Sequence, residues 1–222
     1  MKKHLITFLV DTSGSMYGKL GSVKEALALF QSSLEEDFYH NAQLEISVVT
    51  FGEDACVLVP PTPAKEFNVP QITEYGLTYI WKGLYQTFTL IDDWKSHNRE
   101  LGYPYYKPWI ILITDIEGDN TCDLSDDRFK ALALHRLRKK DANIFPMGIG
   151  YNVSREILNQ ITLDDMQPIF IEIENIEENA VPATKEHNVK LCFNKTDTKK
   201  NTCRDNRIRS ADFKKLGWLV FL

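Results

Sequence analysis

Two runs of strand length are almost entirely apolar. Residues 5–10 form the first and residues 109–114 the second. Continuous apolar runs of this length are typical of central strands that are covered on both faces of a parallel sheet. The first run is followed directly by Asp11 and the second by Asp115. The pattern therefore predicts two buried strands that each lead into an acidic side chain.

Stretches between the strands carry apolar residues every three or four positions, which predicts helices packed on a sheet. We expect these helices over residues 19–37, 79–94, 126–140 and 154–161. The inward-facing residues expected in the first helix are Val23, Leu27, Phe30 and Leu34. Those expected in the third are Phe129, Leu132 and Leu137.

The remaining strands complete an α/β pattern. They are expected at residues 44–51, 55–59, 144–150 and 168–173. The connection between the first two of these is too short for a parallel crossover, so that pair must be antiparallel. Three prolines, Pro60, Pro61 and Pro63, are expected to end the strand at 55–59 and to mark it as a sheet edge. We predict a three-layer, doubly wound, mainly parallel sheet of order 3-2-1-4-5-6, with the third strand as an antiparallel edge.

The periodic pattern weakens after residue 173. We expect one domain over residues 1–175 and a polar, basic extension over 176–222. Ser210 is placed to cap a terminal helix. The apolar end of that helix, residues 218–222, is expected to dock on the body or on another chain.

Composition is that of a soluble globular protein, with 43% hydrophobic and 26% charged residues among 222. The apolar run at 5–10 is too short to span a bilayer and lacks a cleavage site, so we expect a cytoplasmic protein without membrane contact. Residues 185–215 carry ten Lys or Arg against four Asp or Glu, a balance of +6. Since the whole chain carries −5, the rest carries −11, which argues against a main domain that binds nucleic acid.

The four cysteines have no close-spaced framework, so reduced thiols are expected in the cytoplasm. A zinc site from His187, Cys192 and Cys203 is an alternative, but its spacing matches no compact metal knuckle.

A metal site is indicated by the segment that follows the first strand. Asp11, Ser13 and Ser15 alternate along a loop, so their oxygens can face one point, and Gly14 relieves crowding between the two hydroxyls. Carboxylate and hydroxyl oxygens suit Mg²⁺, with Mn²⁺ or Ca²⁺ as alternatives. If the predicted strand order holds, Asp115 ends the neighbouring strand at the reversal of the sheet, where ligands gather. The competing interpretation is a polar turn in which Asp11 or Ser13 caps the next helix.

These residues resemble the von Willebrand factor type A (VWA) domain. Residues 8–16 look like its opening strand and the Asp-x-Ser-x-Ser start of a metal-ion-dependent adhesion site. Gly76-Leu77-Thr78 before a helix resembles the second loop of that site, and Ile113-Thr114-Asp115 resembles the third element. The resemblance implies metal ligands at Asp11, Ser13, Ser15, Thr78 and Asp115.

A narrower likeness is to the small intracellular VWA proteins of the bacterial tellurium-resistance type, carried by residues 48–52, 146–150 and 158–162 among others. It implies a stress-response or phage-defence context, with kinase-like or phosphatase-like proteins encoded nearby as partners. The chain departs from the family pattern around the metal. We expect the side chains that surround it and contact a partner to be Tyr79, Trp81, Ile116, Glu117 and Asp119.

The sequence thus favours a non-enzymatic adaptor or scaffold that binds an acidic residue of a protein partner through Mg²⁺. Two alternatives stay open. A Mg²⁺-dependent phosphoester hydrolase would need a general base or nucleophile near the metal, and Ser13 stands where a phosphatase would prefer a second aspartate. A structural assembly subunit would use the metal for stability and the apolar C-terminus for association.

Overall fold

The computed structural model describes residues 2–33, 42–117, 124–162, 167–173 and 189–192. Helices and strands alternate along the chain in this order: β1 (Lys2–Asp11), the 3₁₀ turn η1 (Gly14–Met16), α1 (Leu20–Ser33), β2 (Ala42–Phe51), β3 (Ala55–Pro63), η2 (Ala64–Glu66), α2 (Ile80–Glu100), β4 (Trp109–Thr114), α3 (Leu124–Arg138), β5 (Asn143–Ile149), α4 (Arg155–Ile161), β6 (Ile169–Ile173) and β7 (Val189–Cys192).

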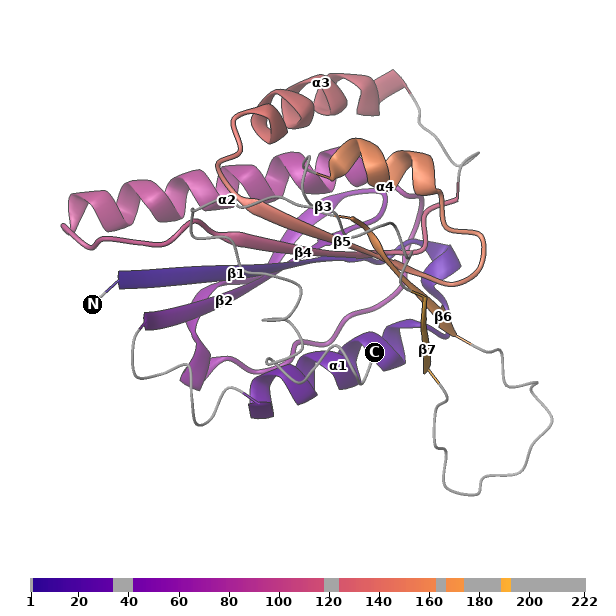
Figure 1. Ribbon diagram of the computed structural model, residues 1–222, viewed down its shortest axis with the longest axis horizontal. Helices are drawn as coiled ribbons and strands as arrows, with labels where there is room; N and C mark the ends of the chain where they lie inside the picture. Colours follow the sequence, from indigo (N-terminus) through magenta and orange to yellow (C-terminus); the bar gives the residue numbers. More distant parts are fainter. Residues whose placement is uncertain (1, 34–41, 118–123, 163–166, 174–188, 193–222) are drawn as a thin grey trace, which may run out of the picture.

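The strands form one sheet of order β3-β2-β1-β4-β5-β6-β7. The pairs β1–β2, β1–β4, β4–β5 and β5–β6 are parallel, whereas β3 and β7 are antiparallel to their neighbours. Helix α1 covers one face, and α2, α3 and α4 cover the other (Figure 1). The predicted fold class and strand order are therefore confirmed, and β7 extends the sheet by one strand that the sequence pattern did not indicate.

Two hydrophobic clusters, one on each face of the sheet, form the core. Alternate residues of β1 contribute to opposite clusters, because successive side chains of a strand point to opposite faces. Ile6 and Phe8 join the cluster that contains α1, and Leu5 and Leu9 join the cluster that contains α2. Burial of each large apolar side chain is worth about 1.5–3 kcal/mol, so the sheet is held between its helices from both sides.

Three details of the predicted elements are corrected by the structure. Strand β3 continues to Pro63, because an edge strand has one unpaired side on which a missing N–H costs nothing. In α3, Leu132 is exposed and Ala133 is buried in its place beside Leu137. Helix α2 runs to Glu100 instead of residue 94.

Helix α2 ends at a local backbone motif that depends on Gly102. Gly102 has a φ of 71°, the left-handed conformation that glycine adopts without strain. The N–H of Gly102 donates to the carbonyl of Arg99 at 3.1 Å, and the N–H of Tyr103 donates to the carbonyl of Asn98 at 2.9 Å. These two hydrogen bonds make a Schellman motif, which ends the helix.

The predicted stripe of α1 is present as far as the structure describes it, with Val23, Leu27 and Phe30 buried. Leu34, the expected end of α1 near residue 37 and the expected terminal helix from Ser210 lie outside the described residues. Within the described part of the chain, no helix is both long enough and apolar enough to cross a bilayer.

Candidate metal centre

The candidate site lies where β1 and β4 end. These strands are parallel neighbours, with Val10 opposite Ile113, so their carboxyl ends meet at one edge of the sheet. Asp11 is the last residue of β1, and Asp115 follows the last residue of β4. From β1 the chain continues to β2 and β3 on one side, whereas β4 to β7 lie on the other. The two carboxylates therefore stand at the reversal of strand order, where doubly wound folds bind ligands.

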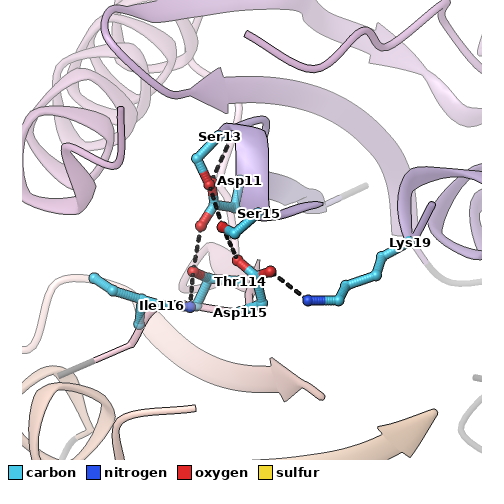
Figure 2. A network of polar contacts seen from close by, with 7 residues as sticks. All are labelled: Asp11, Ser13, Ser15, Lys19, Thr114, Asp115 and Ile116. Carbon is cyan, nitrogen blue, oxygen red and sulfur yellow. Dashed lines mark hydrogen bonds and ion pairs between the residues drawn. The ribbon is translucent and has the colours of Figure 1, made fainter. Parts of the chain in front are cut away.

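A chain of hydrogen bonds joins the two carboxylates (Figure 2). The backbone N–H of Ser13 donates to Oδ1 of Asp11 at 2.8 Å. The hydroxyls of Ser13 and Ser15 are 3.1 Å apart, and the Ser15 hydroxyl donates to Oδ1 of Asp115 at 2.8 Å. Four of the five predicted ligands are thus brought into one network of oxygen atoms.

Two further residues belong to this network and were missed from the sequence. The Thr114 hydroxyl donates to Oδ2 of Asp11 at 2.5 Å and accepts from the N–H of Ile116 at 3.1 Å. The Lys19 ammonium donates to Oδ2 of Asp115 at 2.5 Å (Figure 2). A hydroxyl at the end of an apolar strand was the available signal for Thr114. Lys19 gave none, because its partner is 96 residues away.

Asp11 is fully buried, and its carboxylate has hydroxyl and amide neighbours but no ion pair within the described residues. Burial raises the pKa of this carboxyl to about 6, because the charged form loses its hydration. Hydrogen bonds from Ser13 and Thr114 oppose the rise, and the nearby charge of Asp115 adds to it. A cation beside Asp11 would supply the compensation that the protein groups do not.

The loop before α2 brings the fifth predicted ligand to the same edge. The N–H of Gly14 donates to the carbonyl of Gly76 at 3.1 Å, so residues 76–78 run beside the loop that follows β1. Thr78 is buried there, and its hydroxyl is not hydrogen-bonded to the network within the described chain. Gly76 has a φ of 78°, whereas Gly14 does not have a positive φ. The left-handed backbone conformation in these two loops is therefore at Gly76.

The structure corrects the expectation for two of the five side chains that were expected to surround the metal and contact a partner. Trp81 and Ile116 are buried in the core on the α2 face, because their neighbours in the fold are apolar. Tyr79 is half-buried and Glu117 is exposed. Asp119 lies outside the described residues.

The donor set fits a hard divalent cation. It consists of two carboxylates and three hydroxyls, which are the ligand types that Mg²⁺ and Mn²⁺ prefer. Among the described residues, no group of three or more His, Cys, Asp or Glu could hold a metal ion, so a zinc-type cluster is not found there. His187 and Cys203 of the alternative zinc site are outside the described residues.

Comparison with known proteins gives one family match. The model of the von Willebrand factor type A domain matches residues 6–184. No curated protein matches the chain.

Solved structures share the fold at low sequence identity. A von Willebrand factor type A protein from Catenulispora acidiphila has a TM-score of 0.55 and 19% identity, and the match covers 72% of this chain and 36% of that one. Proximal thread matrix protein 1 of the mussel byssus, in a structure with a zinc-occupied MIDAS motif, has a TM-score of 0.47 and 20% identity, over 72% and 39% of the chains. The match thus spans little more than a third of either protein. At these identities the likeness is to the fold alone.

Proposed function

Because the chain belongs to the von Willebrand factor type A family, we propose that it is a metal-dependent protein interaction module. Domains of this family generally serve as interaction modules, and those that hold a metal generally bind protein partners. The observation that carries the proposal is the partly buried hydrogen-bond network that joins Asp11 to Asp115 through the N–H of Ser13 and the hydroxyls of Ser13 and Ser15.

The residues that would hold the ion share oxygen donors and a position at one edge of the sheet: Asp11, Ser13, Ser15, Thr78 and Asp115. The bound ion would be Mg²⁺, or Mn²⁺ or Ca²⁺, and it would offer an open coordination position to an acidic side chain of the partner. The chain contributes the arrangement of the donors. Ser13 holds the Asp11 carboxylate through its N–H, and Ser15 holds that of Asp115 through its hydroxyl.

Thr114 and Lys19 hold the two proposed carboxylate ligands in place through hydrogen bonds. Thr114 fixes the second oxygen of Asp11, which leaves that carboxylate little freedom to rotate. Lys19 does the same for Asp115 and offsets part of its charge. With both carboxylates held in place, the ion would meet a site that needs little rearrangement to bind it.

The test is direct measurement of metal binding. Isothermal titration of the full chain with Mn²⁺ and with Mg²⁺ should show one site in the wild type and none in Asp11→Ala. Metal at a hundred times its Kd should stabilise the wild type by about 2.7 kcal/mol, which is seen as a higher Tm. Asp93→Ala, an exposed aspartate of α2, is the matched control and should bind as the wild type does. Wild-type protein that takes up no divalent ion would refute the proposal.

The biological context is a finer inference. The likeness of residues 48–52 and 146–150 to tellurium-resistance-type proteins supports a bacterial stress-response or phage-defence role. Kinase-like or phosphatase-like proteins encoded nearby are then the first partners to test. Their binding to the chain should require Mg²⁺ and be lost in EDTA.

A further inference from the structure

The most exposed large apolar side chains of the described residues lie at the same edge as the candidate metal centre. They are Tyr17, Tyr75, Leu77 and Tyr151, with 79%, 73%, 60% and 60% of their surface accessible. We call these four residues the tyrosine rim. The next most exposed, Leu101, follows the far end of α2. Large exposed apolar side chains that gather around one site indicate contact with another molecule.

Backbone hydrogen bonds connect the tyrosine rim to the loop that follows β1, which carries Ser13 and Ser15. The N–H of Tyr17 donates to the carbonyl of Gly14 at 3.2 Å, and the N–H of Tyr75 donates to the carbonyl of Thr12 at 2.6 Å. Leu77 follows Gly76, whose carbonyl accepts a hydrogen bond from the N–H of Gly14 in that loop.

Tyr151 approaches from another side of the site. It follows Gly150, where an added side-chain carbon would lie 3.6 Å from the Lys19 ammonium that binds Asp115. Loops from three parts of the chain therefore bring exposed aromatic and apolar side chains to the edge of the sheet where the two carboxylates lie.

The loops of this edge also carry exposed acidic residues. Glu53 packs against Gly76, and Glu74 precedes Tyr75. The backbone of Glu117 forms an isolated antiparallel β-bridge with Val153. None of the three glutamates has an ion pair within the described residues. They would repel nucleic acid and an anionic membrane surface.

The candidate metal centre would carry a net positive charge once a divalent ion is bound. Asp11 and Asp115 balance the two charges of the ion, and Lys19 adds one positive charge. Lys82 and Asp54 form an ion pair beside the site and together add no net charge. A positive centre would thus lie at an edge of the sheet whose loops carry three exposed glutamates and three exposed tyrosines.

We propose that the tyrosine rim selects a protein segment in which one Asp or Glu is flanked by Arg or Lys. This inference rests on the proposed metal-dependent function. The central carboxylate matches the positive centre, and the flanking cations match the three glutamates. Tyrosine faces attract Arg and Lys side chains through cation–π contacts. A segment with acidic flanks would meet like charges at the rim, so the flanking residues supply specificity.

The test is selection of random linear peptides displayed on phage, with the immobilised full chain in Mg²⁺ and elution by EDTA. We expect the eluted peptides to share one Asp or Glu with an excess of Arg and Lys beside it. Fluorescence polarisation of the synthetic peptides then gives affinities. Tyr75→Ala and Tyr151→Ala should each weaken binding roughly fivefold, as expected for loss of a cation–π contact. Their Mn²⁺ affinity should stay at the wild-type value.

Two variants serve as controls. The combined change Glu53→Gln, Glu74→Gln and Glu117→Gln should abolish the preference for basic flanks but keep the need for a carboxylate. Tyr103→Ala, an exposed tyrosine that follows the far end of α2, should bind peptides as the wild type does.

The outcomes separate this inference from the proposed function. Peptides that elute with EDTA but carry acidic or apolar flanks would overturn the inference and leave the metal-dependent function standing. Equal peptide affinity in the rim variants and the wild type would also overturn it. Failure of the wild type to bind Mn²⁺ would overturn both.

Discussion

Lys19 places a fixed positive charge on one carboxylate of the candidate metal centre. Its ammonium is 2.5 Å from Asp115, whose side chain is almost fully buried. Because a nearby cation repels a divalent ion, Lys19→Met should tighten Mn²⁺ binding about tenfold, which corresponds to about 1.4 kcal/mol. Isothermal titration at fixed ionic strength measures the change.

Lys24→Met is the matched control for that experiment, since Lys24 lies further along α1. It should leave the Mn²⁺ affinity within about twofold of the wild-type value, because screening weakens distant surface charges. Weaker binding in Lys19→Met would instead mean that Lys19 mainly holds Asp115 in the geometry the ion needs.

His4 is a second residue with a measurable charge effect, at the opposite end of β1. It lies seven positions before Asp11, about 23 Å along a strand. Its ring packs edge-on against Trp109, with the ring centroids 4.8 Å apart, and its Nε2 has no hydrogen-bond partner within the described residues. Burial lowers the pKa of His4 to about 4, although a hydrogen bond to the backbone of Lys107 opposes the shift.

The pKa of His4 predicts a loss of stability in acid. Between pH 6.5 and pH 4 the unfolded chain is protonated at this histidine and the folded chain is not, so the unfolded state binds more protons. From His4 alone, the free energy of unfolding should therefore fall by up to about 3 kcal/mol as the pH falls through this window. Asp11, whose pKa is raised to about 6, contributes with the opposite sign below pH 6, so the His4 contribution is the difference between the wild type and His4→Phe. Urea unfolding at pH 7, 5.5 and 4.5 measures this contribution.

His4→Phe should remove this part of the pH dependence, whereas His97→Gln, at an exposed histidine, should retain it. The same decline in wild type and His4→Phe would assign the acid sensitivity to other groups.

At the scale of elements, the loop before α2 depends on a conformation that other residues rarely adopt. Gly76 has a φ of 78°, and a side-chain carbon there would lie 2.7 Å from Cβ of Glu53. Gly76→Ala should lower the free energy of unfolding by about 2 kcal/mol or more, as expected for a left-handed non-glycine residue with a close contact. It should also weaken Mn²⁺ binding, since the loop carries Thr78.

Gly14→Ala is the contrasting variant, because the added carbon would be 3.8 Å from the nearest atom, the carbonyl oxygen of Gly76. Surface substitutions without a clash change stability by less than about 0.5 kcal/mol. Urea unfolding of both variants makes the comparison. If Gly14→Ala were the more destabilising, the loop contacts would have been assigned wrongly.

The apolar pattern predicted the central elements well for a physical reason. Strands such as β4 are buried on both faces, so nearly every residue must be apolar and the signal is strong. The pattern failed where structure depends on distant neighbours. Strand β7 is short and forms only against β6, and the prolines of β3 are tolerated only because the strand is at the edge.

The same distinction applies to the site. The placement of Asp11 and Asp115 followed from strand ends and sheet order, which are local pattern and topology. The sequence did not predict which side chains around the site are exposed, because an aromatic residue near a loop can turn inward or outward. Trp81 turns into the core, whereas Tyr75 is exposed, and only the packing of α2 on the sheet decides between them.

At the scale of the whole molecule, the candidate metal centre unites parts of the chain that are far apart in sequence. Ser15 and Asp115 are 100 residues apart, and Thr114 and Asp11 are 103 apart. All four meet only when β1 and β4 are paired in the sheet. No short piece of the chain therefore contains the site, and the proposed ion should have affinity only for the assembled domain.

That separation in sequence bears on the kinetics of folding. Loop closure over about a hundred residues is slow and unfavourable until other contacts support it, so the two carboxylates should come together late. An ion that binds after the transition state lowers the unfolding rate and leaves the refolding rate unchanged. Stopped-flow measurements with Mn²⁺ should show this asymmetry in the wild type and lose it in Asp11→Ala. The ion would then slow the unfolding of the folded domain and would not accelerate its folding.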